Sequence, residues 1–306
     1  MNRSSLTFAG AAVAFLCGCG SGKTGGVIPE RDGGDTTEDL RAPVKPDAAT
    51  PLDAAAPGPS KFGDVLLNAD SYASFADTSI FAFFDVTEPS PSTDAGAPSC
   101  TFSTVGACSV GLCTGTSSGG GPAPVAASAG QLTVTGTKTY TVLPSATFGY
   151  SLDDSAAGWS PGSTIAVSAS GATVPAFATT VKAPGVVKVG TPALSTSGTA
   201  PVFARSSNLA LAWTGGAGAQ LSVSLIDAAG TASLLCTYDA STGSASIPSS
   251  ALQMLPARTG YTLYGSTSSD AANALVMAQG WTVSVSAYAN AQSSGGALYS
   301  QTVTLQ

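Results

Sequence analysis

The sequence contains no histidine, and only 9% of its 306 residues are charged, against roughly 25% in an average soluble protein. Histidine is the commonest general base and metal ligand, so its absence excludes Ser-His-Asp and Cys-His catalysis and ordinary zinc chemistry. The 11 basic residues are outnumbered by 18 acidic ones, and no stripe of Lys and Arg is present to contact phosphates. We therefore expect no nucleic-acid partner, no metal and no other cofactor.

Hydrophobic runs long enough to cross a bilayer as a helix are also missing. The apolar run Leu6–Leu16 has eleven residues, whereas a transmembrane helix needs about 20. A short basic start, Met1–Arg3, precedes it. This order of segments predicts an export signal rather than an anchor helix.

The residues after this run, Leu16-Cys17-Gly18-Cys19, resemble the lipobox of bacterial lipoproteins. The resemblance implies that residues 1–18 are a signal peptide, and that Cys19 becomes the first residue and carries diacylglycerol. Gly20 in the next position implies sorting to the outer membrane. The alternative is cleavage by the ordinary signal peptidase, with two incidental cysteines.

A second pattern lies at the same junction. Gly18–Thr24 ends in Gly-Lys-Thr, like a phosphate-binding loop, but Gly18 precedes Gly22 by four residues rather than five. No helical pattern follows Thr24. We therefore expect no nucleotide site.

Residues 19–60 contain mostly Gly, Pro, Ala and Asp and almost no bulky apolar side chain. Such a segment cannot bury a core, and as flexible coil it would hold the rest of the chain some tens of Å from the membrane, at about 5 to 6 Å × √n for n residues. We interpret it as a solvated tether behind the lipidated cysteine.

Beyond the tether, Ser and Thr alternate with Val, Leu and Ala. This alternation is clear in Leu132–Thr135, Ile165–Ser168, Leu221–Leu225 and Trp281–Ser286. One apolar and one polar face is typical of half-buried antiparallel strands. Turn residues recur about every eight to twelve residues, and Ser249–Leu255 is the one good helix candidate. The pattern predicts an all-β fold of antiparallel sandwiches.

We place a domain boundary near residue 190. Residues 61–190 would form a first β-sandwich, which includes the aromatic run Ile80–Val86 as a buried strand. Residues 191–306 resemble an immunoglobulin or fibronectin type III sandwich, because a strand with an early Trp, Leu209–Trp213, begins a series of seven. The other six candidate strands are Gln220–Asp227, Leu234–Asp239, Ser244–Ile247, Tyr261–Ser266, Trp281–Tyr288 and Leu298–Leu305.

Four cysteines remain after the lipobox: Cys100, Cys108, Cys113 and Cys236. An even number in an exported protein predicts disulfides. We expect at least one bridge within the first three, with all three pairings open. Cys236 either joins the third of them or stays a buried thiol, and the buried thiol is slightly favoured. The spacing does not fit a Cys₄ zinc site.

Trp213 and Trp281 lie in or at the start of alternating runs and are expected in the core. Trp159 lies in a turn, where it either covers one end of a sandwich or stacks on a sugar. The pair Asp153-Asp154 is the one candidate for a two-carboxylate hydrolase. Adjacent residues of a strand point to opposite faces, and the context favours a polar turn.

Three segments, Trp159–Phe177, Leu209–Gly216 and Cys236–Pro248, are similar to segments of predicted lipoproteins of myxobacteria. The resemblance implies a β fold and an envelope location, and it implies no activity.

The leading hypothesis is a non-catalytic lipoprotein of the outer membrane that acts as a surface, adhesion-type or structural interaction module. Its partners would be the membrane, through the lipid, and an envelope protein or polysaccharide. The alternatives are a carbohydrate-binding module, indicated by Trp159, Tyr140, Tyr150 and Tyr288, and a hydrolase that uses Asp153 or Asp154.

Overall fold

The computed structural model describes residues 60–72, 76–87, 99–114, 125–194 and 199–306. The expected signal peptide, Cys19 and most of the tether lie outside these residues. Within them the prediction of an all-β sandwich fold is confirmed. The helical elements there are α1 (Ser249–Leu252) and two single 3-10 turns, η1 (Ala240–Thr242) and η2 (Asp270–Ala272).

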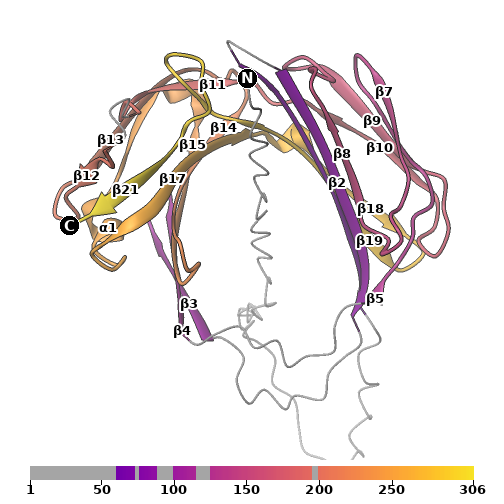
Figure 1. The fold of residues 1–306 in the computed structure, drawn as a ribbon, viewed down its shortest axis with the longest axis horizontal. Coiled ribbons are helices and arrows are strands. Elements are labelled where there is room, and N and C mark those ends of the chain that lie inside the picture. Colours follow the sequence, from indigo (N-terminus) through magenta and orange to yellow (C-terminus); the bar gives the residue numbers. More distant parts are fainter. Residues whose placement is uncertain (1–59, 73–75, 88–98, 115–124, 195–198) are drawn as a thin grey trace, which may run out of the picture. The chain divides into compact units, whose positions relative to one another are not determined.

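The largest element is a sheet of 13 strands (Figure 1). Its main path runs β3 (Ser99–Val105), β4 (Cys108–Thr114), β15 (Ala232–Asp239), β14 (Gln220–Asp227), β17 (Arg258–Ser268), β19 (Trp281–Asn290), β1 (Ser60–Ser71), β2 (Ala76–Thr87) and β5 (Val125–Ala126). The remaining strands pair with members of this path: β18 (Asn273–Ala278) with β19, β8 (Tyr150–Asp154) with β2, β21 (Ser300–Leu305) with β17, and β12 (Val202–Phe203) with β21.

Two four-stranded sheets complete the fold. The first has the order β10 (Phe177–Lys182), β9 (Thr164–Ala169), β6 (Leu132–Thr135) and β7 (Thr139–Val142). The second has the order β16 (Ser244–Ile247), β13 (Leu209–Gly215), β11 (Val187–Thr191) and β20 (Gln292–Ser293). Each small sheet shares a hydrophobic cluster with a different part of the large sheet.

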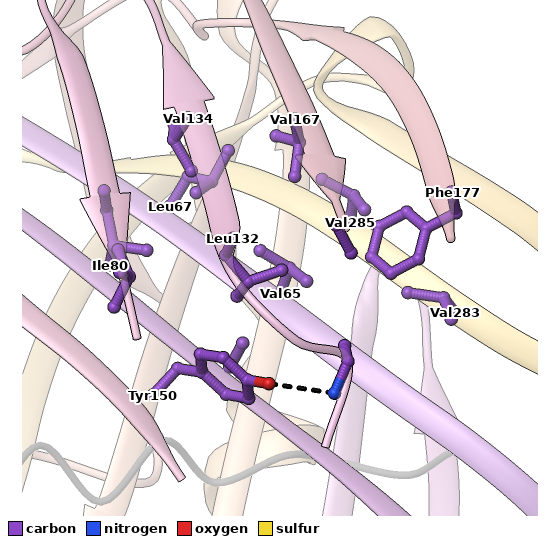
Figure 2. Close-up of a cluster of buried hydrophobic side chains, with 14 of the residues drawn as sticks. Val65, Leu67, Ile80, Leu132, Val134, Tyr150, Val167, Phe177, Val283 and Val285 are labelled. Atoms are coloured by element: carbon purple, nitrogen blue, oxygen red, sulfur yellow. Dashed lines mark hydrogen bonds between the residues drawn. The ribbon is translucent and has the colours of Figure 1, made fainter. Parts of the chain in front are cut away.

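The first cluster joins β1, β2, β18 and β19 of the large sheet to the sheet β10-β9-β6-β7. Figure 2 shows aliphatic side chains from both layers meeting around Val65 and Leu132, each fully buried. The hydroxyl of Tyr150 accepts a hydrogen bond from the backbone N–H of Ala129 at 2.8 Å, so this buried phenol keeps a polar partner. Gly63 leaves room for the ring of Phe84, which would lie 2.2 Å from a Cβ at that position.

The second cluster joins β4, β15, β14, β17 and β21 to the sheet β16-β13-β11-β20. Trp213 is buried in it, as predicted, and its indole Nε1–H donates to the carbonyl of Ala240 at 2.8 Å. Trp281 is also buried, but in the first cluster. The two predicted core tryptophans therefore belong to different cores.

The two clusters interleave along the chain. The first takes Ala272 and four residues of β19 from the carboxyl-terminal third, and the second takes Cys108 and Val110 from the amino-terminal half. A division at residue 190 therefore does not separate them. All described residues fall within one compact unit, Ala55–Gln306.

The individual strands follow the sequence prediction closely. The alternating segments Leu132–Thr135 and Gln220–Asp227 are strands with the same bounds, β6 and β14. The aromatic run Ile80–Val86 lies within β2, and the expected helix is α1, although it is shorter than predicted. Several other strands were not predicted, among them β3, β4, β7, β8, β10, β11 and β18.

The structure contains two disulfides. Cys100 bonds to Cys113, which confirms the expected bridge within the first three cysteines. Cys108 bonds to Cys236, so the preference for a buried free thiol at Cys236 was wrong. The pairing of β4 with β15 places these two residues directly opposite each other, although 128 positions separate them in the sequence.

Removal of the two bridges is expected to have unequal effects. The Cys108–Cys236 bridge closes a loop of 128 residues and the Cys100–Cys113 bridge a loop of 13, so the loss of chain entropy on cross-linking corresponds to about 5 and about 3 kcal/mol respectively. Thermal unfolding of Cys108→Ala/Cys236→Ala should therefore occur at a lower temperature than that of Cys100→Ala/Cys113→Ala. Equal melting temperatures would contradict this.

Candidate functional site

Trp159, for which a sugar contact was the alternative to covering one end of a sandwich, is only 4% exposed and belongs to the first core cluster. Together with Tyr288 and the prolines Pro161 and Pro184 it lines a small hollow with room for about one water molecule. The ring therefore covers one end of the sandwich and offers no open face for a sugar. Tyr140 and Tyr150 are likewise buried.

Asp153 and Asp154 lie on strand β8 and not in the expected turn. The carboxylate of Asp154 accepts hydrogen bonds from Lys138 Nζ at 3.0 Å and from the Tyr140 hydroxyl at 3.1 Å. The bond from Lys138 is the main reason why the pKa of Asp154 lies below its usual range. Asp153 pairs with Ser79 on the opposite face of the strand. The two carboxyl groups therefore diverge, and the lowered pKa of Asp154 is the opposite of what a general acid needs.

A different carboxylate, Asp70 near the end of β1, is buried at 2% exposure. One of its oxygens accepts from the backbone N–H of Asn290 at 2.8 Å, and the other accepts from the Tyr72 hydroxyl at 2.9 Å and from the side-chain amide of Asn290. These donors are all neutral. Burial therefore dominates and raises the pKa of Asp70 above its usual range.

The tyrosines near Asp70 respond to the same environment. Burial is the largest cause that raises the pKa of Tyr72 and of Tyr264, and the charge of Asp70 adds to it. Tyr264 donates its hydroxyl hydrogen to the side-chain oxygen of Asn290. This network lies where β19 leaves β1 and meets β17, so it connects the two parts of the large sheet.

The strongest candidate for a functional surface is the face of β1, β2, β18 and β19 that points away from the first core. We call it the Phe–Asp face, and it comprises Phe62, Asp64, Leu66, Phe81, Phe83, Asp85, Leu275 and Met277. Among these, Phe81 is 42% exposed, Leu275 67% and Met277 69%. The opposite side of the same strands carries core residues such as Val65 and Phe84.

The strand register fixes which of these side chains are neighbours. Phe62 lies opposite Asp85, Asp64 opposite Phe83, and Leu66 opposite Phe81. The rings of Phe62 and Phe83 meet edge to face, with their centroids 6.2 Å apart. Each acid is thus set directly beside an aromatic ring.

Strand β19 lies between β1 and β18, and its hydroxyl residues separate the side chains of β18 from those of β1 on this face. Thr282 of β19 lies between Phe62 and Met277, and Ser284 lies between Asp64 and Leu275. Burial is the main cause of the raised pKa of Asp64. Burial also raises the pKa of Asp85. The outward positions of β1, β2, β8, β18 and β19 contain no Lys or Arg among the described residues.

Sequence reasoning placed Ile80–Val86 in a buried strand and did not identify its second face. The signal was available, because a run of consecutive apolar residues in a strand points alternately to both sides. Phe81 and Phe83 had to lie opposite Ile80, Ala82 and Phe84.

Comparisons with known proteins find few similarities. No family model and no curated protein matches the chain. One solved structure, "Structural insight into host cell surface retention of a 1.5-MDa bacterial ice-binding adhesin", is 15% identical over 70% of this chain and 74% of that chain, with a TM-score of 0.16. Another, "Crystal structure of tetra-tandem repeat in extending region of large adhesion protein", is 14% identical over 75% and 74%, with a TM-score of 0.19. Similarity at these TM-scores supports no conclusion about the fold or the function of this chain.

In the described part of the chain, no group of three or more Cys, Asp or Glu side chains could hold a metal ion. No helix among the described residues is long and apolar enough to span a bilayer.

The ion pair of Asp227 provides a test of the electrostatics in the second core. Burial alone would raise the pKa of Asp227, but hydrogen bonds from Ala232 N–H and Thr231 and the charge of Arg258 together lower it. A lowered pKa means that the stabilisation is present above about pH 4 and is lost as the pH falls through the folded-state value. Asp227→Asn should cost about 1 to 3 kcal/mol at pH 7 in urea unfolding, and less at pH 3. The exposed Asp270→Asn is the control and should change little.

Asp70 should show the opposite dependence on pH. Its raised pKa means that the folded state binds the proton more tightly than the unfolded state, so stability increases as the pH falls from 7 towards 4. In urea unfolding, the wild type should gain stability relative to Asp70→Asn over this interval. A relative loss of stability would show that the hydrogen bonds to the carboxylate outweigh its burial and lower its pKa, which would contradict the prediction.

Proposed function

We propose that this protein is a non-catalytic lipoprotein, anchored in the bacterial outer membrane through Cys19, whose β-sandwich part acts as an adhesion-type or structural interaction module. The resemblance of Leu16–Cys19 to a lipobox supports the anchor. The tether in residues 19–60 would carry the folded part away from the lipid.

The observation that carries the interaction role is the Phe–Asp face, where large apolar side chains lie exposed on the side of the sheet opposite the core. Several exposed apolar side chains gathered on one face of an otherwise hydroxyl-rich protein are typical of contact surfaces. The carbohydrate-binding alternative is not favoured, because Trp159, Tyr140 and Tyr150 are buried.

The anchor is tested by intact-mass analysis of the wild type, Cys19→Ala and Cys17→Ala expressed in a Gram-negative host. The wild type and Cys17→Ala should carry diacylglycerol and lack residues 1–18, because Cys17 is removed with the signal. Cys19→Ala should carry no lipid.

Protease treatment of intact cells then tests the location. Digestion of the folded part in intact cells supports a surface module, whereas protection until the outer membrane is opened supports a periplasmic one. An unmodified Cys19 in the wild type would overturn the lipoprotein proposal.

A further inference from the structure

We propose that the Phe–Asp face binds a basic polypeptide segment in extended conformation, one in which pairs of Lys or Arg alternate with pairs of apolar residues, so that the side turned to the face carries both kinds. This inference rests on the proposed function in one respect, since it names the contact surface and the partner of the interaction module. It is carried by the apolar exposure, the charge and the register of four neighbouring strands.

The apolar part of the face requires a partner with apolar side chains. Leu275 and Met277 alternate along β18, which pairs with β19 on one side, and both are more than three-fifths exposed. Phe81 adds an exposed ring on β2. Transfer of such side chains from water gives about 25 cal/mol per Å² of apolar surface buried. Scattered single exposed residues need no explanation, but these share one face with the half-buried Phe62 and Phe83.

The charge of the face selects a cationic partner. Asp64, Asp77, Asp85 and Asp153 all occupy outward positions of β1, β2 and β8. Because no outward position of these strands or of β18 and β19 carries a base, the acids have no cationic neighbour on the face. A second copy of the same face would bring like charges together, and an anionic bilayer surface would be repelled in the same way.

The dimensions of the face suit a polypeptide. From β18 through β19 and β1 to β2 there are three strand spacings, about 14 Å in total at roughly 4.8 Å each. An extended segment of about four or five residues crosses that width at about 3.3 Å per residue. Apolar side chains at Met277 and Phe62 and an acid at Asp85 follow one another along this line. Because side chains of an extended segment point alternately to its two sides, a segment in which basic pairs alternate with apolar pairs presents both kinds of side chain to the face.

The probe is a fluorescein-labelled 12-residue peptide in which Lys-Lys pairs alternate with Leu-Leu pairs, and its charge-reversed counterpart has Glu-Glu in place of each Lys-Lys pair. Fluorescence anisotropy with the full mature protein should give at least tenfold tighter binding of the Lys peptide. The difference should shrink as salt is raised from 50 to 500 mM. Equal binding of the two peptides would overturn the proposal.

Two double variants test whether the Lys peptide binds to the Phe–Asp face. Leu275→Ser/Met277→Ser and Asp64→Asn/Asp85→Asn should each weaken binding of the Lys peptide at least fivefold. The matched controls are Leu143→Ser/Val202→Ser, which removes two exposed apolar residues elsewhere, and Asp270→Asn. Controls that weaken binding as much as the face variants would overturn the proposal. Thermal unfolding checks that every variant is folded.

Two other occupants are distinguished in the same series. A dimer in sedimentation equilibrium that is abolished by Leu275→Ser/Met277→Ser would make the face a contact between copies and overturn the proposal. Face-dependent binding to phosphatidylethanolamine and phosphatidylglycerol vesicles, with none to the Lys peptide, would also overturn it. The peptide assay does not depend on the lipid: failure with lipidated Cys19 removes only this inference, and binding with unmodified Cys19 removes only the lipoprotein proposal.

Discussion

The pairing of β1 with β19 is the constraint on which the rest of the fold depends. These strands run parallel from Phe62 beside Thr282 to Asn68 beside Tyr288, so the first described strand is joined to one near the end of the chain. Parallel neighbours need a long connection, and here the connection contains the first small sheet, three of the four strands of the second (β11, β13 and β16) and most of the second core. The first core therefore cannot close until β19 is in place, which gives the fold a high contact order.

Strand β19 continues beyond the first core and reaches the strands of the second. Beyond Tyr288, β19 pairs with β17 through Asn290 and Ala289, and Asn290 also donates to Asp70. One backbone segment thus leaves one core and borders the other. The buried Asp70 network occupies this transition, between Ala69, which packs against the first cluster, and Ala291, which belongs to the second. A buried carboxylate can specify one arrangement there, because each N–H or O–H group that donates to it must keep its hydrogen bond.

Strand positions could be predicted from the sequence because the alternation of Ser and Thr with aliphatic residues is a local property. The bounds of β6 and β14 follow from it directly. Partners could not be predicted, since the alternation in Trp281–Ser286 is the same whether that strand completes the nearer or the farther core. For this reason a boundary near 190 looked natural, and Cys236 looked unpaired. The pairing of β4 with β15, which brings Cys108 to Cys236, is a long-range register that no local pattern encodes.

The Phe–Asp face was hidden for a related reason. A run such as Ile80–Val86 looks like a strand buried on both sides, and burial on both sides is what a two-layer sandwich does not offer. Phe81 and Phe83 therefore point to the side of the sheet opposite the core, where Phe81 is exposed among the described residues. Acids set between the aromatic rings reduce self-association through repulsion between identical faces, and they leave the apolar surface open to a cationic partner. The same acids thus disfavour contact between two copies of the face and make the face selective for a cationic partner.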